Sequence, residues 1–368
     1  MGITRRMSST YMGRWLLGPE GVKKGFLRLE ERNLVEVCEG DAPASSSNAI
    51  VLPSFINAHT HIGDSLAFPA PRGSLEEIVA PPHGYKHRIL RSASRSAKID
   101  AMRETMLLMS ASGTSHFVDY REEGLEGLSA LSEAMVGASP RATVLGRPLS
   151  ADSTDGELDS VLRACDGIGM SATRDWPYGF LSRISGHAKA AGKLFSIHAS
   201  EAVHEDIGPI LDLKPDFLVH MVKATDGDLE RCADAGVPVV VCPRSNEFFG
   251  LEPAIARLTR AGINVALGTD NGMIARPDMM EEVKAAFRTI SQGEVSALEI
   301  VNLATFGGRK VLNPKAKITL ETGTDTDLSV VAVVGDDPIS EIVTSASSKD
   351  IQAIVRGGKV WRPETWKA

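Results

Sequence analysis

The middle of the chain alternates short apolar, β-branched runs with longer stretches of helical periodicity. Eight such runs predict strands over Ala49–His61, Thr114–Tyr120, Arg141–Pro148, Gly167–Thr173, Leu194–Ser200, Phe217–Met221, Pro238–Pro243 and Asn264–Asp270. Helices are expected between them, for example over Asp100–Ala111, Tyr178–Ala191, Asp226–Ala235 and Glu252–Ala261. Strands that alternate with helices along the chain are typical of a parallel sheet.

The ends of the predicted helices support this reading. Ala-Gly pairs close three of them, at Ala191-Gly192, Ala235-Gly236 and Ala261-Gly262. Glycine adopts the left-handed conformation just past a last helical turn at little cost. A helix, a glycine and then an apolar strand form the usual connection of a parallel sheet. Residues 54–320 are therefore expected to form an α/β domain, a (β/α)8 TIM-type barrel, with its chemistry at the C-terminal strand ends.

Both ends of the chain carry a different pattern of short, strand-like segments. Outside the predicted barrel they are Gly25–Leu29 and Leu34–Val37 near the start, and Asp327–Val334 and Ile351–Val355 near the end. We expect residues 14–53 and 321–362 to pair into one small β-sandwich domain. Residues near Leu27 and Val331 would then lie close together in space.

Composition and charge narrow the function. The 368 residues are 43% hydrophobic, enough for a large core, and the formal net charge of -7 argues against nucleic acid or an anionic membrane as partner. Four cysteines without a CxxC pair favour reduced thiols in a cytoplasmic protein. No apolar run is long enough to cross a bilayer. A small-molecule substrate is expected, and a homo-oligomer is left open.

The strongest chemical signal is the pair His59 and His61 at the end of the first predicted strand. Residues two apart on a strand point to the same face, so both imidazoles can point into the barrel mouth. Neutral imidazole is a common ligand for zinc and iron. Alternating histidines also occur on exposed strands, and the position at a strand end is what favours a metal site here.

Three further segments place metal-type residues at predicted strand ends. His198 ends the fifth strand with Glu201 just after it, His220 ends the sixth, and Asp270 ends the eighth. Each has a structural alternative: Glu201 as a surface residue at a helix start, His220 as a core or rim residue, and Asp270 as a helix N-cap. Their shared register at the barrel's catalytic end favours a metal centre.

These segments resemble the amidohydrolase superfamily, in particular the branch with cytosine, guanine and S-adenosylhomocysteine deaminases and the triazine hydrolases. The resemblance is carried by Pro53–His61, His198 with Glu201, His220, Cys242–Asn246 and Ala261–Asp270. It implies a metal-dependent hydrolase, an aminohydrolase (deaminase) of a nucleobase-like or other heterocyclic amine that uses a metal-activated water. A cyclic amidase or imidazolone-type hydrolase is the alternative, as is a degenerate, non-enzymatic barrel.

The resemblance also implies roles for these residues. One divalent metal, zinc or alternatively iron(II), would be bound by His59, His61, His198 and Asp270. The catalytic residues would be Glu201, which shuttles a proton, His220, which holds the attacking water without being a primary ligand, and Asp270. Relatives with two metals carry a lysine at the end of the fourth strand. The segment Gly167–Thr173 has none, so a single metal is expected.

Basic side chains also gather at the predicted catalytic end. The candidate substrate contacts are Lys86 and His87 in the first loop, Arg121 after the second strand, Arg147 at the end of the third and Arg174 after the fourth. Arginine binds carboxylates and phosphates through paired hydrogen bonds, so these residues would indicate an anionic substrate. Alternatively, they are neutralised by nearby acidic residues, namely Asp119, Glu122, Glu123 and Asp175.

Overall fold

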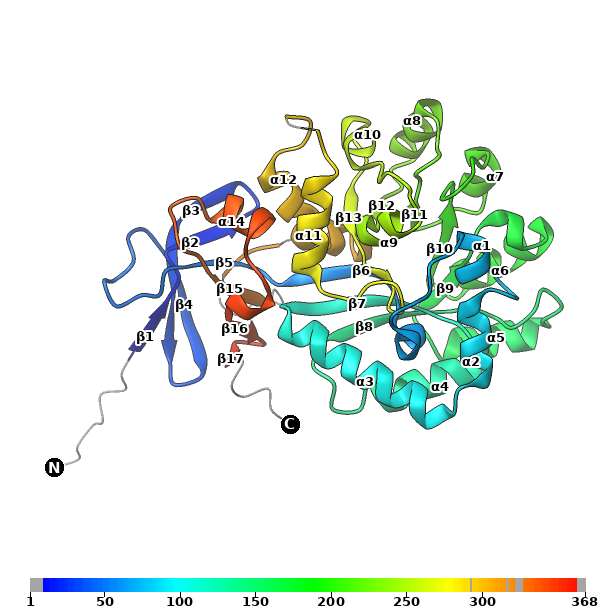
Figure 1. The fold of residues 1–368 in the computed structure, drawn as a ribbon, viewed down its shortest axis with the longest axis horizontal. Helices are drawn as coiled ribbons and strands as arrows, with labels where there is room; N and C mark the ends of the chain where they lie inside the picture. The colour runs from blue at the N-terminus through cyan, green and yellow to red at the C-terminus, as the bar shows by residue number, and fades with distance from the viewer. Residues whose placement is uncertain (1–8, 292, 316–317, 322–326, 363–368) are drawn as a thin grey trace.

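A computed structural model describes residues 9–291, 293–315, 318–321 and 327–362. Its strands form two sheets, one of nine strands and one of eight. Figure 1 shows the larger sheet surrounded by helices, with the smaller sheet beside it and built from both ends of the chain. No helix in the described ranges combines the length and the apolar character needed to cross a membrane.

The larger sheet is a parallel barrel. Its strands are β6 (Phe55–His61), β7 (Thr114–Arg121), β8 (Arg141–Gly146), β9 (Gly167–Met170), β10 (Leu194–Ala199), β11 (Phe217–His220), β12 (Val239–Val241), β13 (Val265–Leu267) and β14 (Asp270–Asn271). Strands β6 to β13 neighbour one another in chain order. The short β14, which continues the eighth strand after β13, pairs with β6 and so closes the sheet. The predicted TIM-type fold is confirmed.

Closure of the barrel depends on a glycine between the two halves of the eighth strand. A Cβ atom on Gly268 would lie 2.8 Å from the backbone nitrogen of His59, closer than any side chain tolerates. The amide of Thr269 then donates to the carbonyl of His59 at 3.1 Å, which joins the last strand to the first. This contact brings Asp270 beside the histidines of β6.

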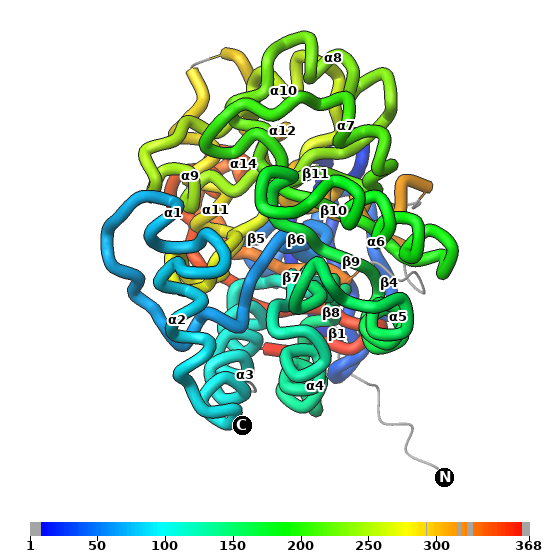
Figure 2. The backbone as a smooth tube through the Cα atoms, turned by 90° about the vertical axis from the view of Figure 1, so that its right-hand side faces the viewer, coloured from blue at the N-terminus to red at the C-terminus, as the bar shows by residue number. Residues whose placement is uncertain are grey.

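The barrel strands are covered by helices, which form a ring around them in the view of Figure 2. The helical segments are η1 (Ile62–Ala67), α1 (Leu75–Ile78), α2 (Tyr85–Ser92), α3 (Arg95–Ala111), α4 (Gly124–Ala134), α5 (Asp155–Arg163), η2 (Thr173–Asp175), α6 (Tyr178–Ala190), α7 (Ile207–Asp212), α8 (Asp226–Asp234), α9 (Pro243–Phe248), α10 (Ile255–Arg260), α11 (Met279–Arg288), α12 (Ala297–Asn302), η3 (Leu303–Gly307), α13 (Gly308–Leu312), α14 (Pro338–Thr344) and η4 (Ser348–Asp350). On β10, Ile197 and Ala199 pack in the apolar layer toward the helices, which leaves His198 on the opposite face.

The smaller sheet joins the two ends of the chain, as expected. Its strands are β1 (Ser9–Met12), β2 (Trp15–Gly18), β3 (Gly21–Glu30), β4 (Asn33–Glu39), β5 (Ala49–Pro53), β15 (Leu328–Ala332), β16 (Ile351–Arg356) and β17 (Lys359–Trp361). Their order is β1-β3-β2-β5-β15-β16-β17-β4, and β4 also pairs with β3, so the sheet closes into a small β-barrel. Positions 322–326 of the predicted C-terminal segment lie outside the described residues.

The first predicted strand, Ala49–His61, is wrong as one continuous strand. It breaks at Ser54, so that β5 belongs to the small sheet and β6 to the barrel. Ser54 donates its amide to the carbonyl of Asp327 at 2.8 Å, and the amide of the next residue, Phe55, donates to the carbonyl of Gly113. Hydrogen-bond partners change between these two residues, directly after Pro53, and a proline inside an apolar run is a signal for such a break that the prediction of one strand passed over.

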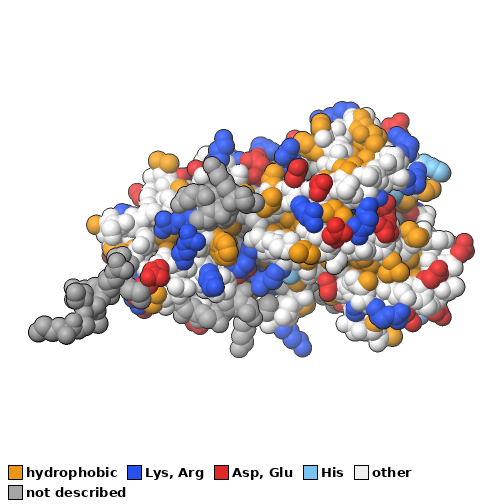
Figure 3. All heavy atoms as spheres, turned by 90° about the horizontal axis from the view of Figure 1, so that it is seen from below, with side chains coloured by type: hydrophobic (Ala, Val, Ile, Leu, Met, Phe, Trp, Pro, Cys, Tyr) orange, Lys and Arg blue, Asp and Glu red, His pale blue; other side chains and the backbone are white. Residues whose placement is uncertain are grey.

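The surface is mixed in charge. On the face drawn in Figure 3, basic and acidic side chains lie interspersed among apolar and neutral ones. The face resembles an ordinary protein surface.

Candidate active site

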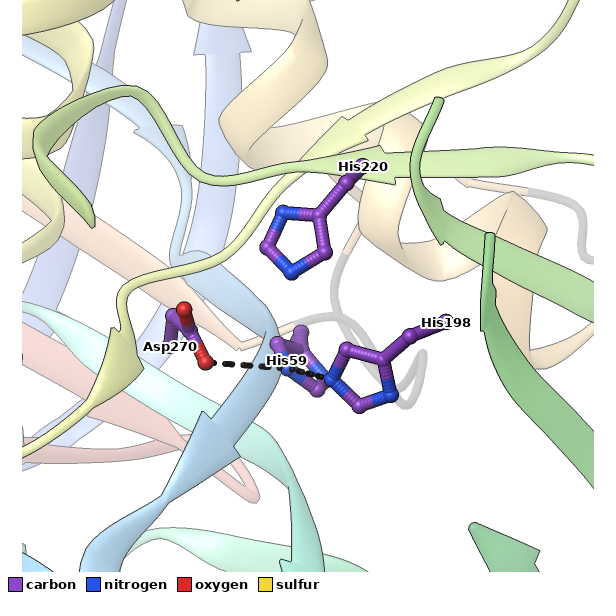
Figure 4. A group of neighbouring side chains, drawn as sticks. All are labelled: His59, His198, His220 and Asp270. Carbon is purple, nitrogen blue, oxygen red and sulfur yellow. Dashed lines mark hydrogen bonds and ion pairs between the residues drawn. The ribbon is translucent and has the colours of Figure 1, made fainter. Parts of the chain in front are cut away.

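Four buried side chains converge at the C-terminal ends of the barrel strands. They are His59 from β6, His198 from β10, His220 from β11 and Asp270 from β14, as Figure 4 shows. One potential ligand atom of each lies within 4.8 Å of those of the others. His220 and Asp270 adopt left-handed backbone conformations, with φ of 76° and 60°. Such conformations are strained for non-glycine residues and cluster at functional sites.

Hydrogen bonding leaves the ligand atoms of two of these residues facing each other. His198 donates from Nδ1 to the carbonyl of Met170 at 2.7 Å, so its Nε2 carries the lone pair. That Nε2 lies 3.2 Å from Nε2 of His59, which in turn lies 3.3 Å from Oδ1 of Asp270. Burial lowers the pKa of both histidines, so both rings are neutral near pH 7.

Asp270 supplies the clearest indication of a cation. Ser245 donates to its Oδ2 at 2.5 Å, which favours the ionised carboxylate. Its Oδ1 is buried and has no hydrogen-bond partner among the described residues. An ionised oxygen in that position costs free energy unless a cation contacts it. Imidazole nitrogens with one carboxylate oxygen form a donor set that suits zinc or iron(II).

His61 lies beside this group. Its Nδ1 donates to Oε1 of Glu122 at 2.7 Å, so the lone pair is on Nε2, 3.6 Å from Oδ1 of Asp270. Burial lowers the pKa of His61 to about 3, so the ring is neutral. Nε2 of His61 and Oδ1 of Asp270 thus face each other with no proton between them. The predicted role of His61 as a metal ligand requires such an unprotonated Nε2. That role stays a prediction.

Glu201 and His220 form the second part of the site. Oε1 of Glu201 lies 3.5 Å from Nε2 of His220. Asn246 places its amide nitrogen 3.4 Å from His220 Nδ1, an arrangement in which Nδ1 accepts and Nε2 carries the proton. Burial raises the pKa of Glu201 to about 7. A carboxyl group with this pKa exchanges protons readily near neutral pH.

One small cavity of about 60 Å³ is lined by five of the site residues, namely His61, His198, Glu201, His220 and Asp270. Its remaining wall comes from Leu75, Val79, Ala80, Pro81, Lys86, Arg147, Ser171, Ala172, Arg174, Asp175 and Asn271. The space holds only a few water molecules. A ring-sized substrate is larger than this space, so the cavity must widen to admit one.

Two of the predicted basic contacts are neutralised inside the protein. Arg121 is buried, donates to Oε2 of Glu122 at 2.9 Å, lies 3.5 Å from Asp119 and does not line the cavity. These carboxylates occupy its guanidinium in the structure, and its role as a substrate contact stays a prediction. Lys86 lines the cavity, but its ammonium lies 2.5 Å from Oε1 of Glu122 and donates to Asn271.

The other three basic residues differ in position. Arg147 and Arg174 both line the cavity. His87 does not, and burial together with the charge of Lys86 lowers its pKa to about 4, so it carries no charge at neutral pH. His87 is therefore not the cationic substrate contact that the loop pattern predicts.

Glu122 is the residue whose role the sequence did not reveal. Burial alone would raise its pKa, but Lys86, His61 and Arg121 hold it well below the usual range. The resulting carboxylate fixes the tautomer of His61. Its position directly after β7 was a signal, but the neighbouring Arg121 suggested only that Glu122 neutralises that arginine.

Comparison with known proteins adds the family. A protein-family model with the description "Amidohydrolase family" matches residues 50–361 of this chain. A Methanothermobacter thermautotrophicus protein named "Putative aminohydrolase" is 33% identical and covers 95% of this chain and 97% of its own length. The 5-methylthioadenosine/S-adenosylhomocysteine deaminase of Halobacterium salinarum is 26% identical, with coverages of 87% and 83%.

Solved structures show the same fold. An adenosine deaminase from Xanthomonas campestris with bound zinc superimposes with a TM-score of 0.76 at 19% identity and covers 95% of this chain and 92% of its own. Atrazine chlorohydrolase from Arthrobacter aurescens, complexed with zinc, gives 0.74 at 17% identity, with coverages of 95% and 94%. At such identities the likeness establishes the fold alone.

Proposed function

Because this chain belongs to the amidohydrolase family, we propose that it is a metal-dependent aminohydrolase that releases ammonia from a heterocyclic amine. One observation carries the proposal. Glu201, whose pKa burial raises to about 7, lies in the same cavity as His220 and Asp270. A proton carrier poised near neutrality beside a candidate metal centre is the apparatus that hydrolytic deamination requires.

The proposed ligands are His59, His61, His198 and Asp270. A divalent ion held there would lower the pKa of the attacking water and polarise the substrate carbon. Ser245 fixes Asp270 through Oδ2, which leaves Oδ1 free to face the site. His220, with its proton on Nε2, would orient the water by hydrogen bonding.

Glu201 would carry the proton. It would accept one proton from water as oxygen bonds to the ring carbon, and then donate that proton to the departing nitrogen. The carbon–nitrogen bond breaks, ammonia leaves, and the ring retains the oxygen. The relative named as a 5-methylthioadenosine/S-adenosylhomocysteine deaminase supports this reaction over hydrolysis of a ring amide.

Ammonia release from a panel of purines, pyrimidines, pterins and cyclic amides tests the reaction. The proposal predicts ammonia, with replacement of an amino group by a carbonyl, from at least one amino-substituted ring. The matched control is the same ring without its amino group, which should be untouched. Ring opening without ammonia would instead identify a cyclic amidase.

The fall of kcat/KM on the acid side of its pH profile should reflect the protonation of Glu201. Because the ionised form must accept a proton, kcat/KM should fall as pH decreases through about 7. Arg174 lowers the pKa of Glu201 and Asp175 raises it. Arg174→Gln should therefore move the acid limb to higher pH, and Asp175→Asn should move it to lower pH. Profiles that stay in place in both variants would exclude Glu201 as the titrating group.

A further inference from the structure

We propose that the substrate carries an anionic group, a carboxylate or a phosphate, which binds to Arg147 and Arg174. The inference rests on the proposed function and names the substrate class of the same site. Both arginines line the cavity that also contains Glu201 and Asp270. They differ from the other basic residues in what surrounds their guanidinium groups.

Arg147 is the main observation. It follows β8 and is only 7% exposed. Among the described residues, its one side-chain hydrogen bond runs from Nε to the carbonyl of Gly169 at 3.2 Å, and it forms no ion pair with a carboxylate. Arginine stays protonated even when buried. A nearly buried guanidinium without an anionic partner is costly, so an anion from outside the chain is expected there.

Arg121 provides an internal comparison. It is the last residue of the neighbouring strand β7 and is 3% exposed, similar to Arg147. Unlike Arg147, it is in contact with two carboxylates, those of Asp119 and Glu122. The buried Arg121, which does not border the cavity, is therefore neutralised within the protein. The fold leaves Arg147 without a partner where the side chain borders the cavity.

Arg174 and Ser171 complete the subsite. The guanidinium of Arg174 is 35% exposed, and its nearest carboxylate, Asp175, is 4.0 Å away. Ser171 lines the same wall and accepts from Nε1 of Trp176 at 2.8 Å, so its own hydroxyl hydrogen is free to donate. Two guanidinium groups and a hydroxyl donor match the oxygens of a carboxylate or a phosphate.

Direct binding tests this inference separately from turnover. Calorimetry would use zinc-loaded Glu201→Gln protein and three matched pairs: pterin with pterin-6-carboxylate, cytosine with 5-carboxycytosine, and adenosine with adenosine 5′-monophosphate. We expect an anionic member to bind roughly tenfold to hundredfold more tightly than its neutral parent, the range for charge-assisted hydrogen bonds. The pair with the preference distinguishes a carboxylate from a phosphate.

Variants added to this inactive background identify the residues. Arg147→Gln should remove most of the preference, and Arg147→Lys should retain part of it, since it keeps the charge without the planar fork. Arg174→Gln is a second variant at a more exposed position, which tests the subsite if Arg147→Gln fails to fold. Arg163→Gln, on the outer face of α5, is the control and should keep the full preference.

The outcomes separate the two proposals. Equal binding of neutral and anionic members, or no binding of any anionic member, would overturn the anionic subsite. If wild-type protein nevertheless releases ammonia from a neutral ring, the aminohydrolase proposal stands. Preferential binding of an anionic ring with no ammonia from any amine would leave the subsite in place and refute the reaction.

Discussion

Glu201→Gln should reduce kcat by about a thousandfold, within the usual range for loss of a general acid–base group, while the metal content stays normal. Glutamine keeps the size of the side chain and cannot carry the proton. The side chain lies beside His220, 3.5 Å from its Nε2, and we assign it to proton transfer and not to metal binding. Elemental analysis and steady-state kinetics on the same preparation measure both quantities.

The matched control is Glu230→Gln, on the exposed surface of α8, which should retain full activity. Loss of metal from Glu201→Gln would place Glu201 among the ligands and contradict its assigned role. Activity within tenfold of wild type would show that another group transfers the proton.

Removal of the metal should abolish turnover and lower the melting temperature. A ligand bound only by the folded state stabilises it by about 2.7 kcal/mol at a hundredfold excess over its dissociation constant. In the metal-free protein, Asp270 Oδ1 is left buried without a hydrogen-bond partner among the described residues. Both effects should therefore appear together when a chelator is added, and calorimetry with activity assays would detect them.

A histidine pair provides the control for this prediction. His198→Asn should reproduce the effects of the chelator, because it removes a proposed ligand that faces His59 and Asp270. His187→Asn, on α6 and paired with Asp155 and Asp159, should bind metal and turn over substrate normally. Equal behaviour of the two variants would contradict a specific site.

The sequence predicted the barrel and three residues of the buried cluster as ligands, namely His59, His198 and Asp270, because both depend on local patterns. The fourth residue of the cluster, His220, was expected to hold the attacking water, and His61 was expected as the fourth ligand. Each barrel strand is an apolar run, and in parallel sheets both faces are buried, so the run is visible. His59, His198, His220 and Asp270 end such runs, and barrel topology brings strand ends together. Residues at equivalent positions of different strands therefore lie close together in space.

The break at Ser54 could not be predicted in the same way. Pro53 marks the place where the strand ends, but it does not show that the two halves join different sheets. The hydrogen-bond partners of Ser54 and Phe55 come from Asp327 and Gly113, which are distant in sequence. Local patterns contain no information about such pairings.

The basic residues show the same limit. Arg121 and Arg147 both follow barrel strands, and only the first has acidic neighbours, Asp119 and Glu122, close in sequence. This difference is visible in the sequence, and it agrees with the carboxylate partners that the structure gives to Arg121 and not to Arg147. The pairing of Lys86 with Glu122 was not visible, since Lys86 lies on α2 and Glu122 follows β7, and α3 separates these two elements in the chain.

Titration of zinc into metal-stripped wild-type protein, with ammonia release measured at each step, tests the central claim most directly. The account predicts no ammonia without metal and a linear rise that levels off at one zinc per chain, since the described residues contain one buried cluster of potential ligands. Activity that is unchanged by stripping, or that requires a second equivalent of metal, would contradict it.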